Sequence, residues 1–195
     1  MSRPTAAAMS DRALAETRAW VERAVIGLQL CPFAKAPQVK GQVRYVTSEA
    51  VDADALLSDL VEELKLLAAA PPERIETTLL VHPQALTDFE DHNDFLEIAE
   101  ATLVALDLEG VIQIASFHPD YRFAGSEPDD IANATNRSPY PTLHLLREES
   151  IERALATFAD PDSIFETNIA TLERLGAEGW AALRRRCRED AERDL

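Results

Sequence analysis

Apolar side chains in the first part of the chain recur every three or four residues, the spacing of one face of a helix. This period runs over residues 14–28 and predicts a helix. Pro32 disfavours helical geometry at Cys31, so the helix is expected to end before the stretch CPFAK. A second apolar stripe predicts a strongly amphipathic helix from about 52 to 69, which ends ahead of Pro71 and Pro72.

The rest of the chain alternates short β-branched runs with longer amphipathic stretches. Four runs are predicted as strands, at residues 42–47, 77–83, 111–117 and 141–148. Thr87 and Glu90 fit a capping box, which predicts a helix from there to about Leu108. Two further helices are expected, over 148–158 and from Asp160 onwards, the last interrupted by Gly176 and Gly179.

This order of elements predicts an α/β (α+β) fold. Strand–helix–strand units favour parallel neighbours, whereas the third and fourth strands lack a long helix between them and are expected to pair antiparallel. We expect a mixed four-stranded sheet with helices packed on it, in a two- or three-layer sandwich. A single domain over 11–187 would lie between a disordered N-terminal tail, 1–10, and a charged C-terminal tail, 188–195.

Charge narrows the classes of partner. The net charge is -16 and the pI is about 4.6, which argues against nucleic acid and anionic membrane, because both require a basic surface. No apolar run approaches about eighteen residues, and the N-terminus lacks the apolar core of a signal peptide. We therefore expect a cytoplasmic protein whose partner is a small molecule; the sequence carries no indication of its oligomeric state.

Histidines mark the ends of two predicted strands. His82 and His118 each follow an apolar strand and precede a proline. If their strands are parallel, both rings lie at the same carboxyl edge of the sheet, where ligands bind in open α/β folds. His144 lies within the fourth strand and points toward the same region in this interpretation. His92 is expected at the surface of its helix, and any of these rings could instead be structural.

Two further stretches carry candidate chemistry. Cys31, at a helix-to-loop junction, is a candidate nucleophile or metal ligand, although free cysteine more often packs as a small apolar side chain. Cys187 is expected to be incidental. The polar segment between the third and fourth predicted strands holds the remaining candidates. They are Asp120, Tyr121, Asp130, Asn133, Asn136 and Arg137.

Three functions are compatible with these residues. In the first, a metal-dependent enzyme holds zinc or iron through Cys31, His118 and His144, with His82 as the alternate ligand. In this scheme Asp120 and Asp130 are bases or hydrogen-bond partners of the ligands, while Tyr121, Asn133, Asn136 and Arg137 orient a small anionic substrate.

The second function is a metal-free hydrolase or acyl or amide transferase, with Cys31 as nucleophile and His118 as its base. The third is a non-catalytic protein that binds a small ligand or a metal. We favour an enzyme, and the metal-dependent scheme slightly, because three histidines exceed what a cysteine–histidine pair requires.

Long strings of the chain resemble a bacterial family designated domain of unknown function 1415. The matching stretches are WVERAVIGLQLCPFAK, ASFHPDYRFAG and DDIANATNRSPYPTLHLLREESI, and the resemblance spans about Thr17 to Trp180. Where LQLCPFA stands here, the family more often has LNLCPFA, a change that touches no candidate ligand. The resemblance implies a small stand-alone bacterial protein and brings no activity or cofactor with it.

Overall fold

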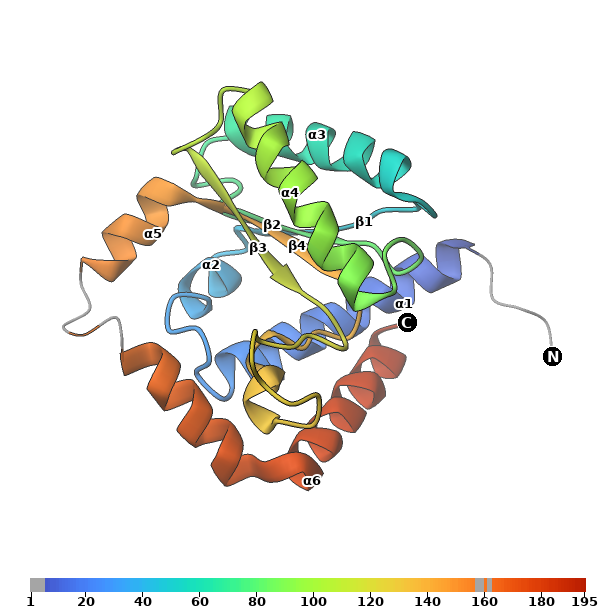
Figure 1. The fold of residues 1–195 in the computed structure, drawn as a ribbon, viewed down its shortest axis with the longest axis vertical. Helices are drawn as coiled ribbons and strands as arrows, with labels where there is room; N and C mark the ends of the chain where they lie inside the picture. Colours follow the sequence, from blue (N-terminus) through green and yellow to red (C-terminus); the bar gives the residue numbers. More distant parts are fainter. Residues whose placement is uncertain (1–5, 157–159, 161–162) are drawn as a thin grey trace.

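A computed structural model describes residues 6–156, 160 and 163–195 (Figure 1). Its elements, in chain order, are α1 (Ala6–Trp20), the π-helical segment η1 (Val21–Ile26), α2 (Lys35–Val39), β1 (Val43–Thr47), α3 (Ala53–Ala69), β2 (Thr77–Val81), α4 (Phe89–Ala105), β3 (Ile112–Phe117), the 3₁₀ helix η2 (Ile131–Asn136), β4 (Thr142–Arg147), α5 (Glu148–Leu155) and α6 (Ser163–Asp194).

The four strands form one open mixed sheet in the order β1-β2-β4-β3. β1 pairs with β2 in parallel, and β4 runs antiparallel to both of its neighbours, β2 and β3. The first three strands therefore point the same way, and β4 lies between the second and the third. The predicted fold class is confirmed, as is the antiparallel pairing of the third and fourth strands.

Helices cover both faces of the sheet, and each face has its own apolar core. Because side chains alternate along a strand, Leu80, Leu143 and Leu145 share one face, and they pack with α3 and α4. Leu79 and Phe117 occupy the opposite face and pack with α1 and α6. Figure 1 shows these helix pairs above and below the sheet.

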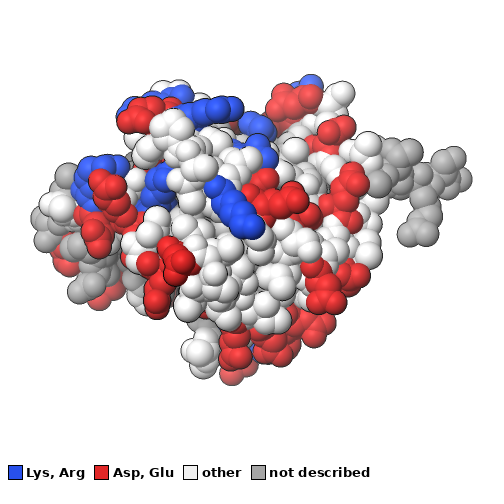
Figure 2. Space-filling view, turned by 90° about the horizontal axis from the view of Figure 1, so that it is seen from above, with Lys and Arg blue, Asp and Glu red and all other residues white. Residues whose placement is uncertain are grey.

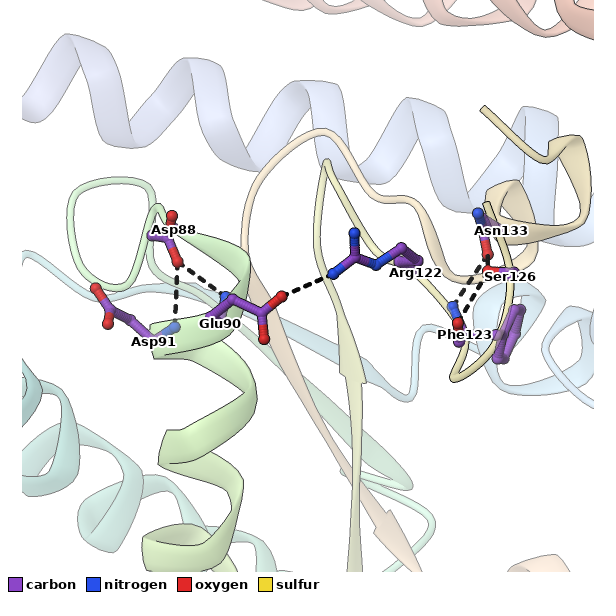
Figure 3. A network of polar contacts seen from close by, with 7 residues as sticks. All are labelled: Asp88, Glu90, Asp91, Arg122, Phe123, Ser126 and Asn133. Carbon is purple, nitrogen blue, oxygen red and sulfur yellow. Dashed lines mark hydrogen bonds and ion pairs between the residues drawn. The ribbon is translucent and has the colours of Figure 1, made fainter. Parts of the chain in front are cut away.

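Aspartate side chains cap the N-termini of α3 and α4, the two helices that pack on the same face of the sheet. Asp52 accepts a hydrogen bond from the amide of Ala55 at the start of α3. Asp88 accepts from the amides of Glu90 and Asp91 at the start of α4, as Figure 3 shows. The N-cap of α4 is therefore Asp88, and the expected cap at Thr87 is wrong by one residue.

Helical structure extends further toward both ends of the chain than the sequence suggested. Residues 6–10, expected in a disordered tail, belong to α1, and residues 188–194 continue α6. Residues 1–5 lie outside the described part. The interruption expected at Gly176 is present: its φ of 67° bends α6, a conformation that glycine adopts without a Cβ penalty. Among the described residues, no helix is long and apolar enough to cross a membrane.

The surface carries both signs of charge. On the face seen in Figure 2, acidic side chains lie along the lower edge and the right side, and basic side chains lie toward the upper left and the centre. Acidic and basic side chains also lie side by side at the upper left and in the centre of this view. The charges of the -16 chain are thus not spread evenly, which leaves room for local basic sites.

Candidate functional site

His82 and His118 lie at the same edge of the sheet, as expected. The His82 amide donates to the carbonyl of Pro141, next to β4 (3.0 Å), and the His118 amide donates to the carbonyl of Asn136, at the end of η2 (3.2 Å). Both positions continue the alternation that directs side chains toward α3 and α4. Their rings therefore lie on the α4 side of the sheet and are fully buried.

A third histidine completes a cluster that the sequence analysis missed. His92 was expected at the surface, but it is 0% exposed, and its ring centroid lies 5.3 Å from that of His82 and 5.2 Å from that of His118. Its spacing explains the burial, because His92, Phe95, Ala99 and Leu103 form the buried stripe of α4. We call His82, His92 and His118 the histidine cluster.

Four of the six ring nitrogens in the histidine cluster have no hydrogen-bond partner. The unpartnered buried atoms are Nε2 of His82, Nε2 of His118 and both nitrogens of His92. Buried polar atoms are normally hydrogen-bonded, and leaving one unpaired costs about 1–3 kcal/mol. Four such atoms in one place therefore mark this cluster as a candidate site.

The partnered nitrogens assign tautomers to two of the rings. Nδ1 of His82 lies 3.0 Å from the carbonyl oxygen of Ala85, so it carries the proton and Nε2 keeps a lone pair. Nδ1 of His118 accepts a hydrogen bond from the amide of Asp120 (3.0 Å), so the neutral ring carries its proton on Nε2. The cluster thus presents an acceptor from His82 and a donor from His118.

Burial keeps the three rings neutral. It lowers the pKa of His82 to about 4 and that of His92 to about 3, with the neighbouring histidines adding to the effect. Burial also lowers the pKa of His118, while the Asp120 carboxylate and the nearby backbone carbonyls of Leu86 and Thr87 act in the opposite direction. At neutral pH every ring therefore has a lone pair, as a metal ligand or a general base requires.

The ring spacing is compatible with a shared ligand, although the donor atoms do not yet converge. Imidazole nitrogens that bind zinc tetrahedrally at their usual bond length place the ring centroids about 5 Å apart. The observed separations are 5.2 and 5.3 Å. However, no group of three or more His, Cys, Asp or Glu in the described part of the chain is arranged to hold a metal ion as it stands.

Aromatic side chains and a strained turn enclose the cluster. The Phe89 ring lies 5.5 Å from that of His118 and 5.4 Å from that of Tyr121. Leu86, in the turn between His82 and α4, has a φ of 49°, which is uncommon for a residue with a Cβ. Backbone strain of this kind is concentrated at functional sites.

His144, expected as a ligand, lies on the opposite face of the sheet. It pairs with Leu79 and Ala115, and its ring is 6.0 Å from that of Phe117. Its Nε2 lies 2.7 Å from Oγ1 of Thr77. Because the Thr77 hydroxyl donates to the carbonyl of Leu145, it accepts from His144, which assigns this ring a partner outside the cluster.

Cys31 lies in the turn after η1, beside the core formed with α1 and α6. Burial raises the pKa of its thiol, and the amides of Phe33 and Ala34 only partly offset this effect. In the part of the chain that the structure describes, no histidine ring nitrogen is hydrogen-bonded to this thiol. Its environment therefore lacks the base and the lowered pKa that an activated nucleophile requires.

The expected substrate-binding residues mostly hold the loops together. Oδ1 of Asn133 accepts from the Phe123 amide and the Ser126 hydroxyl, contacts visible in Figure 3. Asp130 caps η2 by accepting from the amide of Ala132. Nδ2 of Asn136 lies 3.4 Å from the carbonyl of Ser116.

Arg137 and Tyr121 join the loop after β3 to the segment between η2 and β4. Arg137 donates to the carbonyls of Tyr121 (3.1 Å) and Pro128 (2.6 Å). Burial raises the pKa of the Tyr121 hydroxyl, and its hydrogen bond with Asn136 lowers it in part. These contacts fix the backbone from Asp120 onwards, and the amide of Asp120 in turn holds His118.

An ion pair anchors the same loop to α4. Nη2 of Arg122 lies 2.8 Å from Oε1 of Glu90, and both side chains are largely exposed (Figure 3). An exposed pair contributes little to stability, about 0–1 kcal/mol. Its position matters more, because it connects the loop that follows His118 with the first turn of the helix that carries His92.

Comparison with known proteins and protein families identifies the family to which the chain belongs. No curated protein and no solved structure matches the chain. A family model described as "Protein of unknown function (DUF1415)" matches residues 12–182, a range that holds the whole histidine cluster. The match covers most of the 195 residues, and the chain therefore belongs to the DUF1415 family.

Proposed function

We propose that this protein binds a transition-metal ion, zinc or iron, at the histidine cluster. The observation that carries the proposal is the set of four buried ring nitrogens without a partner. Neutral imidazole is a preferred ligand of both metals, and the lowered pKa values keep it available. A bound ion would give a partner to Nε2 of His82 and to one ring nitrogen of His92.

Two of the rings can offer a nitrogen lone pair to a metal ion without rearrangement. His82 presents the lone pair of Nε2, and its Nδ1–H is held by a backbone carbonyl, the arrangement usual for ligating histidines. His92 is free to present either nitrogen. His118 becomes a third ligand only if the amide of Asp120 releases Nδ1; otherwise its Nε2–H is placed to donate to an oxygen atom at the site.

For the reaction we propose hydrolysis of a small anionic molecule. A metal ion bound by neutral ligands can supply activated water. The Asp120 carboxylate lies close enough to His118 to raise its pKa, because its negative charge favours the protonated ring. Because the three rings are fully buried, substrate would enter through movement of the loop that follows β3.

Zinc affinity tests the metal site. We expect metal-free protein to bind one equivalent of zinc in competition with a chromophoric chelator. His82→Gln and His92→Gln should weaken binding at least about tenfold, and His118→Gln should weaken it less, because its lone pair faces the Asp120 amide.

His144→Gln and Cys31→Ser are the matched controls. The first removes the only other histidine, from the opposite face of the sheet, and the second removes the thiol expected as a ligand. Both should bind zinc as the unaltered protein does. Failure of the unaltered protein to bind zinc or ferrous iron after reconstitution would refute the proposal, as would loss of binding in the controls alone.

A further inference from the structure

Three arginines from two separate segments border one small cavity. The cavity, about 40 Å³, lies between α1, the residues that precede β4 and the last turns of α6. Arg137 lines it from the loop, and Arg184 and Arg188 line it from successive turns of α6. We call it the arginine pocket.

The two α6 arginines are exposed to solvent and are not held by an acidic partner among the described residues. Neither Arg184 nor Arg188 forms an ion pair or donates a hydrogen bond to any residue that the structure describes. Burial lowers the pKa of Arg137, and the positive charge of Arg184 lowers it further, while Asp120 and Asp130 act in the opposite direction. Cationic groups that border one cavity without an acidic partner favour binding of an anion, although water and salt weaken the attraction of exposed groups.

A buried tryptophan also lines this pocket. Trp20 is 2% exposed and lines the cavity, and its Nε1 has no acceptor. Indole nitrogen only donates hydrogen bonds, and a buried tryptophan normally finds an acceptor. The pocket therefore brings cationic side chains next to a buried indole whose N–H lacks an acceptor, and a small anion bound there would change the surroundings of that indole.

One acidic side chain also faces the pocket, and its charge is compensated. Oε1 of Glu16 accepts from Nε of Arg12 at 2.7 Å, and Tyr140 interacts with both side chains. The Cys187 thiol forms another part of the wall, next to Arg23, which pairs with Asp190. Counting these pairs as neutral leaves Arg184 and Arg188 as the excess charge, since Asp120 and Asp130 act on Arg137.

We propose that the arginine pocket binds the oxyanion group of a small molecule, a phosphate or a carboxylate. Guanidinium groups match both in geometry and form strong charge-assisted hydrogen bonds with them. The volume has room for about three water molecules, which suits one such group and not a larger ligand. Arg184 and Arg188 lie beyond the residues matched by the family model, whereas Trp20 and Arg137 lie within them.

NMR of the indole N–H groups tests the proposal directly. The chain has two tryptophans, so the ¹⁵N-labelled full-length protein gives two indole signals, which Trp180→Phe assigns. We expect inorganic phosphate or acetate, titrated at constant ionic strength with a chelator present, to shift the Trp20 signal saturably. Arg184→Ala and Arg188→Ala should each weaken this binding at least about tenfold.

Arg186→Ala is the control, because it removes the same charge from the same helix outside the pocket. It should bind the anion as the unaltered protein does. Whichever anion binds more tightly identifies the group that the pocket accepts. The proposal is overturned if neither anion shifts Trp20 saturably, or if all three arginine variants weaken binding equally. The chelator keeps the result independent of the metal site.

Discussion

At the scale of single residues, the histidine cluster is unusual because its rings are both neutral and unsatisfied. A fold gains little from burying an imidazole nitrogen that has no partner, since each such atom costs about 1–3 kcal/mol. His144 shows the ordinary solution in the same chain, with its Nε2 held by Thr77. The contrast supports a functional reason for the cluster.

These lowered pKa values predict how stability changes with pH. An unfolded histidine titrates near 6.5, whereas His92 in the folded protein titrates at about 3 and His82 at about 4. Between these values the unfolded chain binds more protons than the folded one. The metal-free protein should therefore lose stability as pH falls below about 6.5, by up to about 1.4 kcal/mol per pH unit for each ring.

Urea denaturation between pH 7 and pH 4.5, with a chelator present, measures this slope. His92→Gln removes one of the titrating groups and should make the slope shallower by up to about 1.4 kcal/mol per pH unit. Asn93→Gln, on the exposed side of the same helix, should leave it unchanged. Identical slopes in all three proteins would show that His92 is not held neutral by the fold.

Strand patterns predicted part of the site at this scale. His82 and His118 could be placed at one edge because each follows an apolar run, and the structure confirms that edge. His92 was missed because its helix begins with exposed acidic residues, although its spacing to Phe95 and Ala99 already indicated burial. The face occupied by His144 depends on strand register, which the sequence does not specify.

At the scale of elements, one arginine joins the end of β4 to the end of α3. The Arg147 guanidinium donates to the carbonyls of Leu67 (2.7 Å), Ala70 (2.6 Å) and Ile75 (3.1 Å). The last carbonyls of a helix lack partners within it, and a cation near them interacts favourably with the helix dipole. Arg147 therefore serves as the C-terminal cap of α3.

Replacing this arginine should be costly. Arg147→Met keeps the apolar stem and removes the donors, so we expect the free energy of unfolding to fall by about 2–4 kcal/mol, as hydrogen bonds to charged groups are lost. Arg153→Met removes an exposed pair with Glu149 and should cost less than about 0.5 kcal/mol. Urea denaturation of the two variants compares them, and equal effects would contradict the capping role.

Element boundaries followed the sequence where proline, aspartate or an apolar period marked them. The start of α3 at Asp52 and its end before Pro71 are examples. The short helices α2 and η2 were not predicted, because neither is long enough to show a helical spacing of apolar residues. Contacts with other segments hold them instead. The π-helical geometry of η1 likewise has no counterpart in the spacing of residues 14–28.

At the scale of the whole molecule, a single sheet connects two cores and two candidate sites. The histidine cluster lies on the α4 side, and the arginine pocket lies between α1 and α6 on the other side. The segment from His118 to Pro139 contributes to both, since Arg137 holds the carbonyl of Tyr121. Element order predicted the mixed sheet, but the insertion of β4 between β2 and β3 is a long-range pairing that local patterns do not encode.

The most direct test of the metal site is a long-range ¹H–¹⁵N spectrum of the four histidine rings, recorded before and after one equivalent of zinc. Before zinc, we predict four neutral rings at pH 7, with His82 protonated on Nδ1 and His118 on Nε2. Zinc should move the ring nitrogens of His82 and His92 most, and leave His144 unchanged. Unaltered spectra after zinc, or a shift confined to His144, would contradict a metal site at the histidine cluster.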